Sequence, residues 1–234
     1  MKASSGSQLL SNFMSYLANM DIFQKEKLPP LGELKVDLGV SVSSLREQLE
    51  VARVLGLVEV HPRTGIRRLP YSFFQSIKAS LFYSLTINHK NFQLYSELRE
   101  HIEASYWEDA VGKLNPDDIR DLQELVDQAW LKLSGQPVQI PQFEHRELHL
   151  SIYKRLENPF VTGLLEGYWE MYDAVGLNVY TDYDYLERVW QYHQAMVEAI
   201  SLGDFSEGHR LLIDHMQLLS ERPVRGNQNN GYIK

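Results

Sequence analysis

The sequence contains no cysteine among its 234 residues. Disulfide bonds, thiolate nucleophiles and thiolate metal ligands are therefore excluded, and any metal site must use His, Asp or Glu side chains. The chain also lacks an apolar run close to the roughly 20 residues that a membrane-spanning helix needs. Its first residues do not combine a basic segment with a hydrophobic one and a cleavage site. We therefore expect a cytoplasmic protein that does not enter a membrane.

The chain also has no excess of positive charge, and its net charge is −8. Taken over the whole chain, this value argues against a nucleic-acid partner. The distribution is uneven, however. Residues 1–70 carry nine Lys or Arg and seven Asp or Glu, a net of +2, whereas the remainder carries fourteen and twenty-four, a net of −10. Such a difference in net charge between two parts of a chain is typical of a nucleic-acid-binding part that is joined to an acidic part.

Residues 1–70 show the pattern of a winged helix-turn-helix. A helix is predicted over 8–20 and an extended link over 27–30, since a residue before proline is pushed out of the helical region. Two short helices, near 33–38 and 41–55, then follow with a glycine in the turn between them. The segment LVEVHPRTGIRRLP predicts a β-hairpin, the wing.

A recognition helix of this kind can enter the major groove, with the wing beside it. The arginines of this region could be ordinary solvated charges, but their concentration on the recognition helix and the wing favours contact with phosphates or base edges. The residues expected to contact DNA are Ser43, Ser44, Arg46, Arg63, Thr64, Gly65 and Arg67.

After Pro70 the sequence predicts long helices. They are expected near 72–86, 91–111, 116–133, 141–156, 159–176, 183–202 and 205–221. Asn115-Pro116, Asn158-Pro159 and Gly203-Asp204 supply breaks with caps for the following helices. The expected fold is therefore mostly α, with the winged helix-turn-helix followed over 71–222 by an all-α antiparallel bundle that binds a ligand. The polar segment 223–234 is expected to be a disordered tail.

Histidines lie on the core-facing stripe of three of these helices. His145 and His149 are four residues apart in FEHRELHLSIYKRL and share a face with Leu148 and Ile152, while His193 and His215 lie among apolar residues of two later helices. An unpaired polar group in an apolar core costs free energy. A shared metal would supply the missing partners.

The last two histidines are predicted to lie at the same height in a helical hairpin. His193 precedes Gly203 by ten residues and His215 follows it by twelve, so at about 1.5 Å per residue both lie roughly 15–18 Å from the turn. A single buried histidine is most often hydrogen-bonded to a neighbour, but three or four at consistent heights favour a metal or polar-ligand site. Nitrogen ligands suit zinc, nickel or copper, and we expect zinc or nickel. His209, on another helix face, is expected to be solvated.

Several segments resemble a known family. LPPLGELKVDLGVSVSSLREQLEVARVLGLVEVHPRTG resembles the winged helix-turn-helix of GntR-type bacterial transcription regulators. LYSELREHIEA, HRELHLSIYKRLENPF and HQAMVEAISLGDFSEGHRLLIDHM resemble the all-helical FCD ligand domain of the FadR branch, so the resemblance spans roughly 8–220. It implies a homodimer that binds operator DNA, as a repressor, and releases it when a small carboxylate effector binds.

The resemblance also implies a divalent metal held by one Asp and three His. The three histidines of the family fall on His149, His193 and His215, and a family arginine falls on Arg99. The guanidinium of this arginine could clamp an effector carboxylate. The alternative is an ordinary intrahelical pair with Glu103, four residues on.

Two departures from the family pattern leave alternatives open. The aspartate of the family falls on His145. Either four imidazoles bind the metal, or three bind it and His145 supports them. Glu144 cannot replace the aspartate, because its side chain should point away from the helix face of His149. In the DNA-reading part, Gly32 and Val42 replace two frequent arginines. A sensor that no longer reads DNA is therefore one alternative. Another is a histidine-ligated metalloenzyme, with Glu144, Glu147 or Tyr153 as base.

Overall fold

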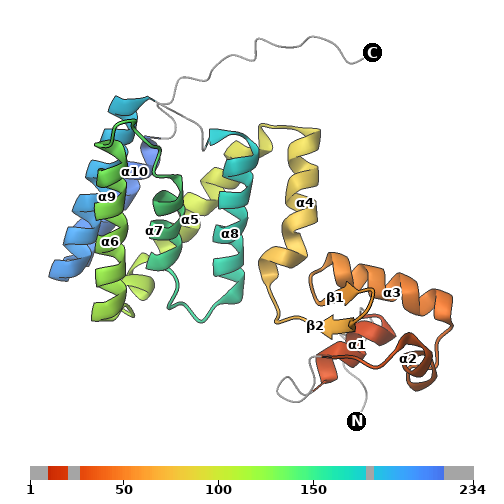
Figure 1. Ribbon diagram of the computed structural model, residues 1–234. Helices are drawn as coiled ribbons and strands as arrows, with labels where there is room; N and C mark the ends of the chain where they lie inside the picture. Colours follow the sequence, from red (N-terminus) through yellow and green to blue (C-terminus); the bar gives the residue numbers. More distant parts are fainter. Residues whose placement is uncertain (1–9, 21–26, 178–181, 219–234) are drawn as a thin grey trace, which may run out of the picture. The chain divides into compact units, whose positions relative to one another are not determined.

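The structure is a computed structural model that describes residues 10–20, 27–177 and 182–218 (Figure 1). The chain divides into two compact units, residues 1–89 and 90–234. No helix among the described residues is long and apolar enough to cross a membrane. The predicted tail, 223–234, lies outside the described residues.

The first unit has the predicted helix-turn-helix and hairpin. Its elements are α1 (Asn12–Asn19), α2 (Leu31–Asp37), α3 (Val42–Val54), β1 (Val58–His61), β2 (Gly65–Arg68) and α4 (Phe73–Ile87). The strands pair antiparallel, with Val58 opposite Arg68 and His61 opposite Gly65. The link before α2 also joins this hairpin, because the backbone N–H of Leu28 donates to the carbonyl of Ile66 at 2.9 Å.

Local signals define the turn between α2 and α3. Gly39 has a φ of +63°, which a residue without Cβ adopts at little cost. Ser41 then caps α3, its Oγ accepting from the backbone N–H of Ser44 at 3.1 Å. Most of the buried side chains of this unit form one core, which includes Phe13, Leu34, Leu45, Leu49, Ala52, Val58 and Ile66.

The two compact units meet after His89, whereas the sequence analysis placed the domain boundary after Pro70. The reason is that α4 is attached to the end of α3. Ser76 Oγ donates to the carbonyl of Leu55 at 3.2 Å, and a Cβ added at Gly56 would come within 2.5 Å of Gln75 Cβ. The helix predicted as the first of the bundle therefore belongs to the winged unit.

The second unit is all-helical, as predicted. Its helices are α5 (Asn91–Val111), α6 (Pro116–Leu133), α7 (Gln142–Ile152), α8 (Pro159–Ala174), α9 (Tyr183–Leu202) and α10 (Phe205–Gln217). The hairpin of α9 and α10 turns at Gly203, whose φ is +74°, and Asp204 accepts from the backbone N–H of Glu207 at 3.0 Å. This is the turn that the sequence predicted.

Three of the predicted helix ends differ from the structure. The helix expected over 8–20 begins at Asn12. The helix expected over 141–156 ends at Ile152, although Leu156 beyond it is still buried. The helix expected over 205–221 is seen to Gln217, and residues 219–221 lie outside the described part of the chain.

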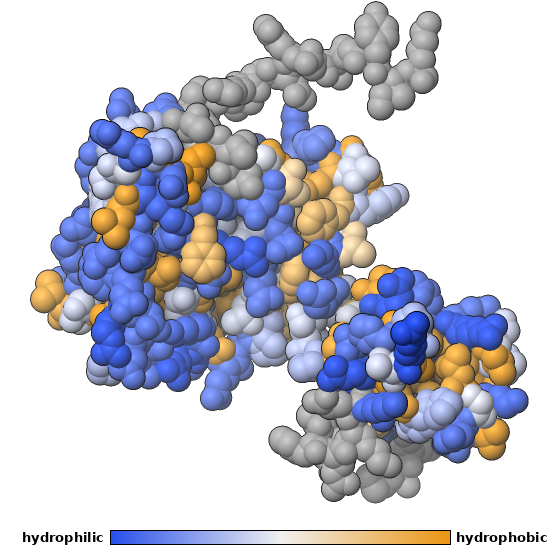
Figure 2. Space-filling model, in the orientation of Figure 1, coloured by the Kyte–Doolittle hydropathy of each residue, from blue (hydrophilic) through white to orange (hydrophobic). Residues whose placement is uncertain are grey.

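A large apolar core and a smaller aromatic cluster of Tyr168, Trp169 and Tyr172 hold the second unit together. The large core draws buried side chains from several of the helices, among them Trp107, Leu122, Leu148, Trp190, Met196 and Leu212. Figure 1 shows α6, α9 and α10 side by side, with α7 next to α6. Hydrophilic side chains cover most of the face of this unit seen in Figure 2, as expected when the apolar stripes of the helices face inward.

Candidate metal centre

The four predicted histidines come together in the interior of the second unit. His145 and His149 come from α7, His193 from α9 and His215 from α10. Their ligand nitrogens all lie within 4.8 Å of one another. Three of the side chains are buried and that of His145 is half-buried. The structure therefore brings together the residues that the sequence predicted, including the one that stands in place of the aspartate of the family.

The distances within the cluster fit a metal. His193 Nε2 lies 3.2 Å from His149 Nε2 and 3.2 Å from His215 Nε2. A tetrahedral zinc with Zn–N bonds of about 2.0–2.1 Å places its nitrogens about 3.3–3.4 Å apart. The most distant pair of ligand nitrogens, which lies within 4.8 Å, has to approach by at most about 1.5 Å to complete such a tetrahedron.

Imidazole chemistry also favours a shared cation. His193 Nε2 has two nitrogen neighbours, but a neutral ring nitrogen is either one donor or one acceptor. Burial, together with the neighbouring imidazoles of His215, His145 and His149, holds the pKa of His193 well below its usual value. Burial also lowers the pKa of His149. Both rings are thus neutral at neutral pH, which is the form that binds metals.

Arg99 and Glu103, on α5, lie directly beside this cluster. Arg99 Nη2 is 2.8 Å from Glu103 Oε2 and 2.8 Å from His149 Nδ1. Burial alone would raise the pKa of Glu103, but its interactions with Arg99 and His149 outweigh burial and lower that pKa. The intrahelical pair expected as the alternative for Arg99 is therefore present, and the same arginine also contacts the histidine cluster.

Aromatic rings surround the charged groups. The guanidinium of Arg99 lies 4.6 Å from the ring centroid of Tyr168 and 5.8 Å from that of Trp169. Trp169 is also 4.8 Å from the ring of His145, centroid to centroid. A cavity of about 10 Å³ opens next to His145, between Tyr172 and Trp190. That volume holds about one water molecule, so a larger ligand must displace side chains.

Other predicted positions have mixed outcomes. Glu144 turns away from His149 as expected, because Lys132 Nζ binds its carboxylate at 2.6 Å. The prediction that His209 is solvated was wrong. Its ring is half-buried, packs near Trp107 and lies 3.1 Å from the carbonyl oxygen of Ala104.

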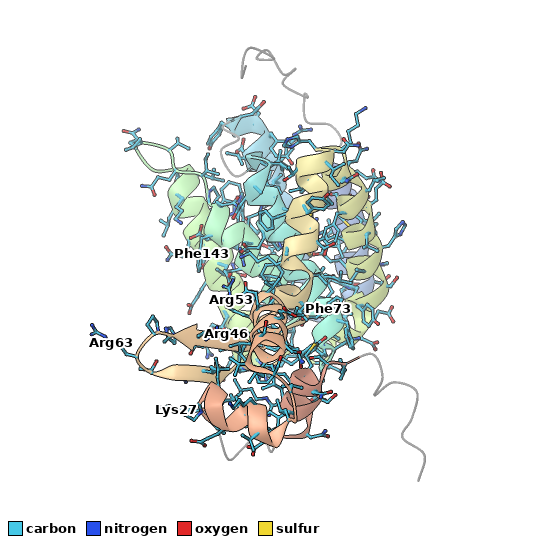
Figure 3. The ribbon with its side chains drawn as sticks, turned by 90° about the vertical axis from the view of Figure 1, so that its right-hand side faces the viewer. Lys27, Arg46, Arg53, Arg63, Phe73 and Phe143 are labelled. Carbon is cyan, nitrogen blue, oxygen red and sulfur yellow. The ribbon has the colours of Figure 1, made fainter. Side chains whose placement is uncertain are left out.

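The residues predicted to contact DNA lie on α3 and on the hairpin. Ser43 and Arg46 are exposed on α3, and Arg63, Thr64 and Gly65 are exposed at the hairpin tip. Figure 3 shows Arg46 on the helix and Arg63 extending from the tip. Two of the predicted residues have internal partners as well. Ser44 Oγ accepts from Gln48 at 3.1 Å, and Arg67 forms an ion pair with Glu59 at 3.2 Å.

Sequence reasoning did not single out two charged residues near these sites. Glu103 appeared only as a partner for Arg99, since its contact with His149 depends on the packing of α5 against the rest of the unit. Lys27, which is labelled in Figure 3, appeared only as part of a link. Its backbone forms an isolated antiparallel β-bridge with Arg67 of the hairpin. No ion pair with another described residue engages Lys27, Arg46 or Arg63.

Comparison with known proteins places these features in context. The model of the FCD domain matches residues 95–218, just over half of the chain. The uncharacterized HTH-type transcriptional regulator YcbG of Bacillus subtilis strain 168 is 22% identical over 227 residues, covering 94% of this chain and 90% of that protein. Streptococcus agalactiae GntR has a similar fold, with a TM-score of 0.69 at 19% identity over 89% of this chain and 95% of that one. E. coli McbR/YncC gives a TM-score of 0.48 at 20% identity, over 84% and 89% of the two chains.

Proposed function

The chain belongs to the FCD-domain branch of the GntR-type transcription regulators, and we propose that it binds operator DNA in a way that depends on a metal and a small carboxylate effector. The observation that carries the proposal is the convergence of four imidazoles beside a buried arginine. Because the relatives are transcription regulators, the metalloenzyme alternative is set aside.

The metal would be held by His145, His149, His193 and His215. A set of four neutral nitrogen ligands suits zinc or nickel, and it leaves the charge of a divalent cation uncompensated by its ligands. Such a cation attracts an anionic ligand to any open coordination position. The half-buried side chain of His145 lines the cavity near the cluster, so we place the entry of the effector on this side.

The effector would be a small organic acid. Arg99 supports this choice because a guanidinium offers paired donors to a carboxylate, and here it is buried beside the cluster, where an ion pair is weakly screened. The cavity of about 10 Å³ does not admit a carboxylate as it stands. Effector binding therefore moves the aromatic side chains around the cavity. This movement would transmit effector binding to the surrounding helices.

DNA binding would use the exposed face of α3 and the hairpin. Arg46, Arg63 and Lys27 are the cations of this face without an ion pair to a described residue, which leaves them available to phosphates. The chain would act as a homodimer, because two winged units then match two half-sites of an operator. The effector acts by linkage: it shifts DNA binding only if its affinity differs between the arrangements that bind DNA and those that do not.

The test is selection from randomised duplexes by the full-length protein loaded with Zn²⁺ or Ni²⁺, with and without a panel of small organic acids. The proposal expects one enriched palindromic motif whose recovery changes with at least one acid. The control is a variant with Arg46→Ala and Arg63→Ala, which should lose the motif and keep the same metal content. No enriched motif under any condition would contradict the proposal.

A second candidate is a sensor that no longer reads DNA. Gly32 and Val42 favour it, because the family often has arginines at these positions. The same selection separates the two functions. A chain that binds metal and organic acid but enriches no sequence, and shows no salt-dependent affinity for duplex DNA, is a sensor of this second kind.

A further inference from the structure

His149 has polar neighbours on both of its ring nitrogens. Nε2 faces the histidine cluster, 3.2 Å from His193 Nε2. Nδ1 faces α5, where it lies 2.8 Å from Arg99 Nη2 and 3.4 Å from Glu103 Oε2. The side chains of His149 and Glu103 are both fully buried, so water does not compete at this end of the ring.

The tautomer of His149 decides which of these neighbours can pair with it. A neutral imidazole that binds a metal through Nε2 carries its proton on Nδ1. This N–H needs an acceptor, because a buried donor without one costs about 1–3 kcal/mol. Arg99 offers only donors, so it cannot fill the role. The carboxylate of Glu103 offers an acceptor, and its Oε2 lies 2.8 Å from Arg99 Nη2 and 3.4 Å from His149 Nδ1.

We propose that Glu103 is the positioning residue of the metal centre: its carboxylate accepts the Nδ1 proton of His149 and directs Nε2 at the cation. This inference rests on the proposed function, since it concerns the same metal. It also identifies the source of negative charge beside the ligand set. With His145 in place of an aspartate, no ligand carries charge, and Glu103 is the buried carboxylate that contacts the cluster.

The competing interpretation is that Glu103 only neutralises Arg99. The two interpretations predict different results for the two halves of the ion pair. If Glu103 positions His149, Arg99→Met leaves the acceptor in place and metal affinity does not fall. If the pair serves the fold alone, Glu103→Gln and Arg99→Met disturb the same contact and act alike.

The experiment measures Co²⁺ and Zn²⁺ affinity of the full-length protein by competition with a chromophoric chelator. We expect Glu103→Gln to weaken both metals by about 10–100-fold, the usual effect of removing a group that orients a metal-bound histidine. Arg99→Met should bind at least as tightly as the wild type. Glu144→Gln is the matched control, because Glu144 is also a buried carboxylate in an ion pair, with Lys132, but faces away from the cluster.

A second readout is specific to the ring proton. In the Co²⁺-loaded protein, the exchangeable N–H of a metal-bound imidazole gives a paramagnetically shifted proton resonance. The signal assigned to His149 should move and exchange faster with water in Glu103→Gln, and it should be unchanged in Glu144→Gln. If Glu103→Gln does not fold, Glu103→Asp keeps the charge beside Arg99 but withdraws the oxygen from Nδ1, and metal affinity should fall in the folded protein.

Each outcome decides the inference. Unchanged metal affinity in a folded Glu103→Gln protein overturns it and leaves the proposed function intact. Equal losses in Arg99→Met and Glu103→Gln overturn it in favour of a structural pair. A wild-type protein without affinity for either metal overturns both the inference and the metal part of the proposed function.

Discussion

At the scale of single residues, the substitution of a histidine for the aspartate of the family is the main departure of this chain. His145 lies four residues before His149 on the same face of α7, and its ring centroid is 4.8 Å from that of His193. An imidazole at this position is neutral and nitrogen-donating, whereas an aspartate would be charged and oxygen-donating. The choice of metal should therefore depend on this one residue.

We predict that His145→Asp shifts metal preference toward Mn²⁺. The carboxylate favours cations that prefer oxygen ligands, so the ratio of Mn²⁺ to Ni²⁺ affinity should rise by about tenfold or more, which corresponds to about 1.4 kcal/mol. Chelator competition with both metals measures the ratio. His101→Asp, at an exposed position on the neighbouring α5, introduces the same change outside the cluster and should leave the ratio as it is. An unchanged ratio in His145→Asp would show that residue 145 is not a ligand.

The histidines could be found from sequence and Glu103 could not, for a physical reason. Helical periodicity places His145 and His149 on one face, and the turn at Gly203 brings His193 and His215 level, so local geometry suffices. For Glu103, sequence offers only the neighbour four residues before it. Its contact with His149, 46 positions away, and its complete burial depend on how the helices pack, which periodicity alone does not determine.

At the scale of helices, the packing of α5 against α10 depends on a residue without a side chain. Trp107 is fully buried, and its Nε1 donates to the carbonyl of Phe205 at 2.8 Å. A Cβ added at Gly208 would come within 2.7 Å of Trp107 Cζ2. Since α10 carries His215, this contact also sets the position of one proposed ligand.

Gly208→Ala should therefore destabilise the protein despite the preference of alanine for helices. Overpacking costs about 1–3 kcal/mol, while alanine regains about 1 kcal/mol over glycine in a helix interior. The expected net loss is up to about 2 kcal/mol in the free energy of unfolding, measured in urea. Gly32→Ala, where nothing lies within 4 Å of an added Cβ, should be neutral or slightly stabilising. A stabilised Gly208→Ala protein would contradict this account of the packing.

The end of α7 shows where helix prediction failed. The apolar pattern continues to Leu156, but the helix stops at Ile152. Beyond it, Tyr153 OH donates to the carbonyl of Glu103 at 2.8 Å, and the next two residues reach the start of α6. Arg155 Nε lies 2.8 Å from Asp118 Oδ2, and Lys154 Nζ lies 2.9 Å from Asp118 Oδ1. These contacts between distant segments outweigh the local helical preference.

Asp118 gives this junction a dependence on pH. Hydrogen bonds from Arg155, the backbone of Asn115 and Lys154 hold its pKa far below the ordinary value. A lowered pKa stabilises the folded state above the unfolded pKa of about 3.9, and the stabilisation is lost as pH falls below it. Asp118→Asn should therefore be less stable than the wild type at pH 7, and the difference should narrow below about pH 4. Urea unfolding at both pH values measures it; a constant difference would sink the prediction.

At the scale of the whole molecule, the wing, the histidine cluster and Arg99 are useful to a regulator only if their ligands are coupled. The two units were predictable as a winged module and a helical bundle, because their periodicities and turn signals differ. Their boundary was not, since α4 has the length and pattern of a bundle helix. The contacts of Ser76 and Gln75 with the end of α3 place this helix in the winged unit.

We predict that metal and effector bind with positive coupling. When His149 binds a metal through Nε2, its Nδ1 becomes a donor, and Arg99 Nη2 loses the acceptor that now lies 2.8 Å away. That donor is then available to a carboxylate, so effector affinity should rise by about 5–150-fold when Zn²⁺ is bound. By linkage, the effector must raise Zn²⁺ affinity by the same factor. Calorimetric titration in both orders measures the two factors.

Arg99→Met provides the control for this coupling. It removes the donor that connects the two ligands, so it should abolish the coupling while Zn²⁺ affinity stays at or above the wild-type value. Operator binding provides a further test of the coupling. An effector that releases DNA from the zinc-loaded wild type should release it from zinc-loaded Arg99→Met only at a much higher concentration. Equal effector affinity with and without Zn²⁺ in the wild type would mean that the histidine cluster serves the fold of the helical unit and does not take part in sensing.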